Sequence, residues 1–166
     1  MTNEHLSDSA VQRNAESAIV EALAAQLGCK GELKPKRVSV LGGSYVQLDA
    51  CSDDERILVE AYARQGKLKG AQIKKISQDI LKLALLKRDP GLSDSRAIAV
   101  FASEEARDSI KGWIRSAAEQ FGIELVVVEI PEALRDEIMV AQARQVMVNV
   151  EIPMEEIADD VSLEMS

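Results

Sequence analysis

The order of the predicted elements favours an α/β fold, in which a mixed sheet carries helices on both faces. One amphipathic helix comes first, three strands rich in β-branched residues follow, and helices then alternate with strands. Short connections predict antiparallel pairing of the three early strands, whereas a helix between two strands makes them parallel. The two late strands, 96–102 and 123–130, are apolar throughout, which is typical of strands covered on both faces.

The first half of the chain predicts one helix and three strands. Apolar residues recur at helical spacing over 9–27, with a serine or aspartate at 7–9 as the N-cap and Gly28 as the stop. Alternating stretches follow, separated by turn residues. The predicted strands span about 37–41, 44–51 and 56–63.

The second half predicts three more helices around the two apolar strands. Ser103 is the predicted cap of the middle helix, and Pro131 stands where a proline opens a helix. Trp113 and Phe121 are expected to lie in the core. The predicted helices span 66–88, 104–121 and 131–147, and a further short strand is possible at 148–152.

Length and composition bound the function. With 166 residues, 46% of them hydrophobic, the chain is expected to form a single α/β domain over 1–150, followed by an acidic tail at 151–166. The single histidine, His5, excludes most histidine-built catalytic and zinc sites. Cys29 and Cys51 form no CxxC motif, and no membrane span or basic-apolar leader is present. A cytoplasmic location is the expectation.

Charge is distributed unevenly along the chain. The net charge is −8, and the tail from 151 onward holds six acidic residues and no basic one. Between Arg64 and Arg88, eight basic residues face Asp79 alone, a local balance of +7. The predicted helix 66–88 therefore carries a basic stripe beside which a polyanion could bind.

Two carboxylates are predicted to meet on neighbouring strands. A four-residue loop that pairs Ser52 with Ile57 places Asp49 directly across from Glu60, and the apolar residues of both strands are expected to share the opposite, core face. Like charges opposite each other are destabilising unless something compensates them. A divalent cation is one compensator, since Mg²⁺ is usually held by one or two carboxylates. Lysines from the following helix, on a solvated face, are the other.

The stretch from Gln47 to Leu83, QLDACSDDERILVEAYARQGKLKGAQIKKISQDILKL, resembles the PD-(D/E)XK nuclease superfamily. The element order extends the resemblance to roughly 9–130 and implies a restriction-endonuclease-like α-β-β-β-α-β core. It implies a metal-dependent nuclease that cleaves DNA or RNA with Mg²⁺ or Mn²⁺. Asp49 and Glu60 would be the metal ligands and catalytic acids, and Glu16 of the first helix a possible third ligand.

The lysine of that family is replaced here. It is expected two residues after the glutamate, where this chain has Tyr62, and a tyrosine supplies no ammonium group. Some members take the lysine from the neighbouring helix, which makes Lys75 the predicted catalytic lysine, beside Gln72. These two share one helical face with Asp79 and Lys82. In the alternative interpretation, Lys75 and Asp79 form an ordinary exposed pair.

Two functions are therefore expected from the sequence. In the first, the chain hydrolyses phosphodiesters of nucleic acid with Asp49, Glu60 and Lys75. Its predicted phosphate-binding residues are Lys67, Lys69, Gln72, Lys74 and Lys82. In the second, the fold is catalytically inactive and serves as a protein-interaction or homodimeric subunit. Its predicted contact surface consists of Leu81, Leu85 and Leu86.

Overall fold

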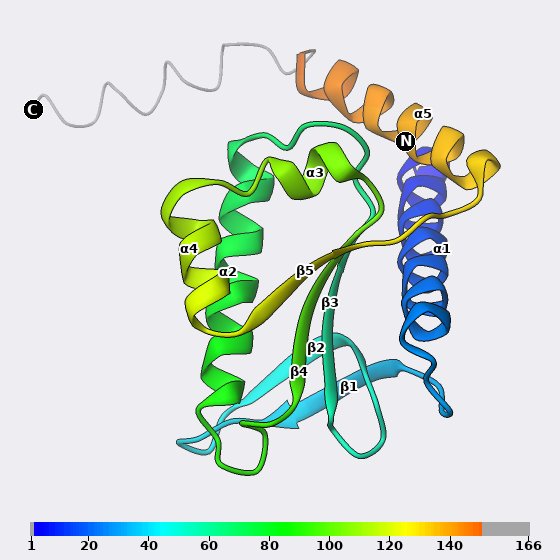
Figure 1. Ribbon diagram of the computed structural model, residues 1–166. Coiled ribbons are helices and arrows are strands. Elements are labelled where there is room, and N and C mark those ends of the chain that lie inside the picture. The colour runs from blue at the N-terminus through cyan, green and yellow to red at the C-terminus, as the bar shows by residue number, and fades with distance from the viewer. Residues whose placement is uncertain (1, 151–166) are drawn as a thin grey trace, which may run out of the picture.

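A computed structural model describes residues 2–150 of the chain. Ten elements lie within this range (Figure 1). They are α1 (Thr2–Leu27), β1 (Lys34–Ser39), β2 (Tyr45–Cys51), β3 (Ile57–Tyr62), α2 (Gly70–Lys87), β4 (Arg96–Phe101), α3 (Glu104–Asp108), α4 (Gly112–Gln120), β5 (Ile123–Val127) and α5 (Glu132–Val150).

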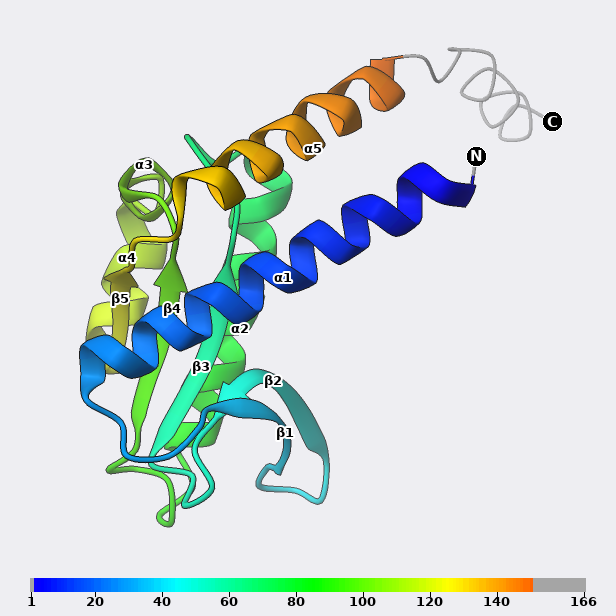
Figure 2. The same ribbon diagram turned by 90° about the vertical axis from the view of Figure 1, so that its right-hand side faces the viewer.

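The five strands form one mixed sheet in the order β1-β2-β3-β4-β5. β1, β2 and β3 pair antiparallel, whereas β3, β4 and β5 pair parallel. Helices α1 and α5 lie on one face and α2, α3 and α4 on the other, as Figures 1 and 2 show. The predicted α/β class with a mixed sheet is confirmed. Among these elements, none is a helix both long and apolar enough to cross a membrane.

Two cores result, one on each face of the sheet. Successive residues of β3 divide between them, since Leu58 packs in the α2 core and Val59 in the α1 core. Helix α1 closes its core with a stripe that includes Ile19 and Leu23, both fully buried. Helix α2 closes the other with residues that include Leu83. Every strand residue of β3 is therefore enclosed or nearly so, Glu60 included.

The structure corrects three sequence-based expectations. The predicted helix 104–121 is two helices, because the chain turns between Ser109 and Lys111 and Gly112 adopts a left-handed φ of 60°. This break turns Trp113 outward, and it is 75% exposed rather than in the core; Phe121 is exposed as well. Residues 148–150 continue α5 instead of starting a strand. The acidic tail, 151–166, lies outside the described residues.

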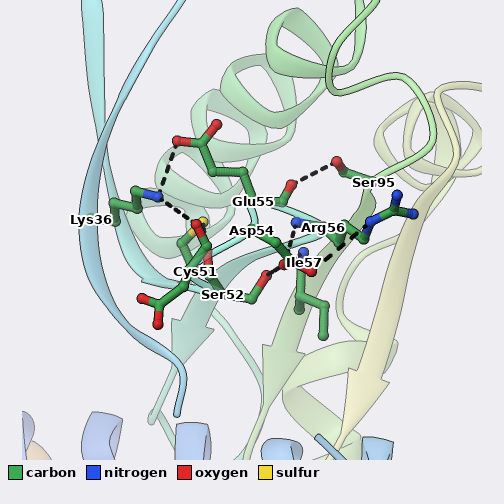
Figure 3. Close-up of polar contacts among 9 residues, drawn as sticks. Lys36, Cys51, Ser52, Asp54, Glu55, Arg56, Ile57 and Ser95 are labelled. Atoms are coloured by element: carbon green, nitrogen blue, oxygen red, sulfur yellow. Dashed lines mark hydrogen bonds and ion pairs between the residues drawn. The ribbon is translucent and has the colours of Figure 1, made fainter. Parts of the chain in front are cut away.

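The turn between β2 and β3 closes as predicted (Figure 3). The Ser52 amide donates to the Ile57 carbonyl at 3.1 Å, and Ser52 Oγ accepts from the Ile57 amide at 3.0 Å. Glu55 has a left-handed φ of 57°, uncommon for a residue with a side chain. Two contacts hold it there: an ion pair with Lys36 of β1 at 3.1 Å, and a hydrogen bond that Ser95 Oγ, just before β4, donates to its carbonyl at 2.7 Å. The turn thereby sets the register of the whole hairpin.

We expect Leu83→Ala to lower the free energy of unfolding by about 2–5 kcal/mol, because it removes a fully buried side chain from the α2 core. Leu81→Ala, on the same helix but 69% exposed, is the matched control and should stay within about 0.5 kcal/mol. Urea unfolding measures both. Equal losses in the two variants would contradict the assigned face of α2.

Candidate functional site

Asp49 and Glu60 come together where β2 and β3 part. Ala50 pairs with Val59 and Cys51 with Leu58, so the next pair along the hairpin is Asp49 and Glu60. The ladder stops there, because the Ala61 amide donates to Asp49 Oδ2 at 2.9 Å instead of to a β2 carbonyl. The predicted juxtaposition of the two acids is confirmed, and the Asp49 side chain takes the place of a strand hydrogen bond.

A β-bulge in β2 accounts for this geometry. Lys34 pairs with Cys51 and Lys36 with Leu48, so Asp49 and Ala50 together face Pro35 alone. The side-chain alternation of β2 changes at this point: Leu48 packs in the α2 core and Ala50 in the α1 core. The expectation that the apolar residues of both strands share one core face is therefore wrong. The alternative in which both acids lie on a solvated face is wrong as well, because Glu60 is buried.

Glu60 lies inside the α2 side of the sheet and is only 2% exposed. Lys82 of α2 forms an ion pair with its Oε1 atom. The same ammonium group lies 3.4 Å from Asp79 Oδ1 and donates to the Gln47 carbonyl at 3.1 Å. Lys82 thus joins α2 to both β2 and β3.

Asp79 extends this cluster to Tyr62. The Tyr62 hydroxyl donates to Asp79 Oδ2 at 2.9 Å, and Lys75 Nζ lies 3.6 Å from the same oxygen. Lys75 also lies 5.5 Å from the centre of the Tyr62 ring, a cation-π distance. We call the set Asp49, Glu60, Tyr62, Asp79 and Lys82 the acidic cluster.

The other predicted site residues lie around this cluster. Lys82, rather than Lys75, is the lysine on Glu60, while Lys75 is exposed beside Tyr62. Gln72 caps α2, since its Oε1 accepts from the Lys69 amide at 2.9 Å. The lysines predicted to contact phosphate at the beginning of α2 are all exposed. They are Lys67, Lys69 and Lys74.

Glu16 of α1 approaches the cluster from the other side. It lines a hollow of about 350 Å³ together with Asp49, and a neighbouring cleft of about 190 Å³ together with Tyr62 and Lys75. Burial raises the pKa of Glu16, and the nearby charge of Asp49 adds to the rise. Asp49 is therefore the member of the acidic cluster that the first hollow reaches.

Burial raises the pKa of Glu60 to about 8, and its hydrogen bond with Asp49 adds to the rise against the opposing effect of Lys82. For Lys82, burial acts against the charged form, but the bond to Glu60 and the attraction of Glu60 and Asp79 outweigh it and raise the pKa. Burial and Asp49 thus favour the neutral form of Glu60, while the carboxylates around Lys82 favour the charged form of that lysine. Burial, followed by the charge of Asp79, strongly raises the pKa of Tyr62.

Asp49 and Glu60 meet the minimum for an Mg²⁺ or Mn²⁺ ion, which is one or two carboxylates with water completing the shell. Glu16 lines the same hollow as Asp49. It does not complete a three-residue metal site, because within residues 2–150 no group of three or more His, Cys, Asp or Glu side chains is arranged to hold a metal. A cation held by both carboxylates would offset the repulsion from Asp49 that helps to raise the pKa of Glu60. The donor set fits a two-carboxylate site.

Comparisons of this chain with models of protein families, with curated proteins and with solved structures give no match.

Asp79 is the cluster member with no functional role in the sequence-based prediction, since only the alternative interpretation used it, in an ordinary exposed pair with Lys75. It is buried and binds Tyr62, Lys75 and Lys82 at once. A signal was present, because Asp79 is the single acid in the basic stretch and stands four residues after Lys75 and three before Lys82. A lone acid at both spacings is positioned to neutralise two lysines on one helical face.

We expect the stability advantage of wild type over Glu60→Gln to shrink as pH rises from about 5.5 to 8.5. Folded Glu60 holds its proton up to about pH 8, whereas the unfolded chain loses it near the ordinary glutamate value of 4.5. The unfolded state then binds fewer protons, so wild-type stability falls with pH, on the order of a few kcal/mol in total. Urea unfolding at several pH values measures the difference.

Glu124→Gln is the control for this titration. The bond to Arg96 lowers the pKa of Glu124. Ionised Glu124 therefore makes its full contribution to the free energy of unfolding above about pH 5 and loses it only at lower pH. The difference between wild type and Glu124→Gln should therefore stay constant from pH 5.5 to 8.5. A constant difference for Glu60→Gln as well would show that Glu60 titrates normally.

Proposed function

We propose that this chain is a metal-dependent phosphodiesterase acting on nucleic acid, with a restriction-endonuclease-like core. The observation that carries the proposal is the meeting of Asp49 and Glu60 at the end of the β2–β3 ladder, with Lys82 on Glu60. The element order from α1 to β4 is α-β-β-β-α-β, which supports the same proposal.

Each residue has a distinct role in this proposal. Asp49 and Glu60 hold Mg²⁺ or Mn²⁺, which when bound polarises a phosphoryl oxygen and lowers the pKa of a bound water. Lys82 supplies the ammonium group missing at Tyr62, and Asp79 positions it through their 3.4 Å ion pair. The exposed lysines at the beginning of α2 offer positive charge to the phosphate backbone.

We expect Mn²⁺ to bind wild type and not Asp49→Asn, as measured by isothermal titration calorimetry. The apparent affinity should increase with pH up to about 8, because the ion replaces the proton that Glu60 holds. Asp53→Asn, an exposed acid in the adjacent turn, is the matched control and should bind like wild type. Equal Mn²⁺ binding by wild type and Asp49→Asn, or none by wild type, would refute the metal site.

Cleavage assays on plasmid DNA, single-stranded DNA and RNA then distinguish the two lysine assignments. We expect Lys82→Gln to lower the cleavage rate by about 10²–10³, the effect of removing one stabilising donor from a reacting centre. Lys75→Gln, which loses contacts only with Asp79 and the Tyr62 ring, should have a much smaller effect. A larger loss of cleavage in Lys75→Gln than in Lys82→Gln would instead identify Lys75 as the catalytic lysine. Thermal melting checks that both variants fold.

A second candidate function, an inactive fold that acts as a homodimeric subunit, is favoured by exposed leucines on α2. Leu81 and Leu85 lie four residues apart and are 69% and 42% exposed. Leu86 is fully buried, so the predicted contact surface loses that residue. In this function the acidic cluster is only a structural ion network.

If this second function holds, wild type should sediment as a dimer and Leu81→Lys/Leu85→Lys as a monomer, because two charges would be buried at the interface. Leu41→Lys, an exposed leucine after β1, is the control. Analytical ultracentrifugation measures all three. A wild-type monomer at tens of micromolar would reject the dimer.

A further inference from the structure

A groove of about 1210 Å³ lies at the carboxyl ends of β3 and β4 and along β5. Its lining comes from the residues after β3 and β4, from β5 and the residues after it, from α3, from one side of α5 and from the end of α1. The carboxyl ends of parallel strands are where ligands bind in open α/β sheets. The groove is distinct from the hollow at Asp49, although Arg64 and Gln142 also line the cleft beside Lys75.

Two arginines of the groove each hold a donor atom that the described residues leave unsatisfied. The Nε atoms of Arg64 and Arg135 are shielded from solvent and make no hydrogen bond within the part of the chain that the structure describes. A shielded donor without a partner is costly, and such groups commonly meet an ion or ligand. The third arginine of the groove, Arg107, is already paired with Asp108 at 2.9 Å.

Two hydrogen bonds join the segment after β3, which carries Arg64, to α5, which carries Arg135. The Gln65 amide donates to Gln142 Oε1 at 2.8 Å, and Gln142 Nε2 donates to the Gln65 carbonyl at 3.1 Å. Arg64 precedes the first of these residues, and Arg135 lies two turns before the second in α5. The floor of the groove is therefore preformed.

The walls of the groove favour a ligand that is more than a bare anion. Exposed Met139 and Val146 of α5 line it together with Val126, and such apolar surface suits a planar or apolar group. Three glutamates also line it: Glu104, Glu105 and Glu129. All three are exposed, so they disfavour a long polyanion more than one small phosphate at the arginines.

We propose that this groove binds a small phosphate ester with a planar or apolar body, of nucleotide size. The phosphate is held by the guanidinium groups of Arg64 and Arg135, whose planar forks match phosphate oxygens. The body lies along the apolar side of α5. This site goes beyond the proposed phosphodiesterase activity and does not depend on it.

Calorimetric titration of the full chain with AMP, glycerol phosphate and inorganic phosphate, in EDTA, tests the proposal. We expect AMP to bind most tightly, and Arg64→Gln and Arg135→Gln each to weaken it about tenfold or more. Arg115→Gln, an exposed arginine of α4 outside the groove, is the matched control. Asp49→Asn should bind AMP like wild type, which separates this site from the metal site.

Conservative variants keep the test interpretable if either glutamine variant fails to fold. Arg64→Lys and Arg135→Lys retain the charge and lose the fork, so they should weaken AMP binding by less than the glutamine variants. No AMP binding by wild type, or equal binding by wild type and all arginine variants, would overturn the proposal. Binding of a single-stranded oligonucleotide without binding of AMP would also overturn it and assign the groove to nucleic acid.

Discussion

The burial of Glu60 is the constraint on which the rest of the site depends. A carboxyl group that is 2% exposed needs a proton or a partner on each oxygen, because burying it charged and unpaired is very costly. Asp49 raises the pKa of Glu60 and so favours its neutral form, and Lys82 forms an ion pair with its Oε1 atom. The charge of Lys82 then needs Asp79, and Asp79 in turn accepts from Tyr62. These ion pairs and hydrogen bonds, together with the buried leucines beside them, determine which face of α2 packs against β3.

The bulge at Asp49 and Ala50 makes room for this arrangement. In a regular β2–β3 ladder, the Ala61 amide would donate to a backbone carbonyl of β2. It would then not need the Asp49 carboxylate as an acceptor. Because β2 instead parts from β3, the Asp49 carboxylate replaces the missing carbonyl. Figure 2 shows the β1–β2 hairpin bending away from β3 and β4. The turn around Ser52 and Glu55 holds the other end of the hairpin in register, so the parting occurs at a defined residue.

The same acidic cluster can serve stability or chemistry, and a single position decides between them. As it stands, the cluster is a buried polar network that fixes α2 on the sheet through Lys82 and Asp79. In the proposed function, the carboxylates of Asp49 and Glu60 would instead hold a cation. The groove along β5 and α5 meets the acidic cluster only near the end of β3, and the Nε atoms of its Arg64 and Arg135 find no hydrogen-bond partner among the described residues.

The sequence by itself determined the α/β class, the mixed sheet, the pairing of Ser52 with Ile57 and hence the meeting of Asp49 and Glu60. These features follow from the hydrophobic periodicity of each segment and from the length of the β2–β3 turn, which fixes the residues that pair across the hairpin. Both depend only on residues close together in the chain. It also placed Lys75, Asp79 and Lys82 on one face of α2, since helical spacing suffices for that. Only the tertiary structure decided that Lys82, not Lys75, reaches Glu60, that the bulge sends Leu48 and Ala50 to different cores, and that Arg64 and Arg135 share a groove. The physical reason is that the axial position of a helix on a sheet, and the approach of segments about 70 residues apart, depend on the packing of both cores rather than on local pattern.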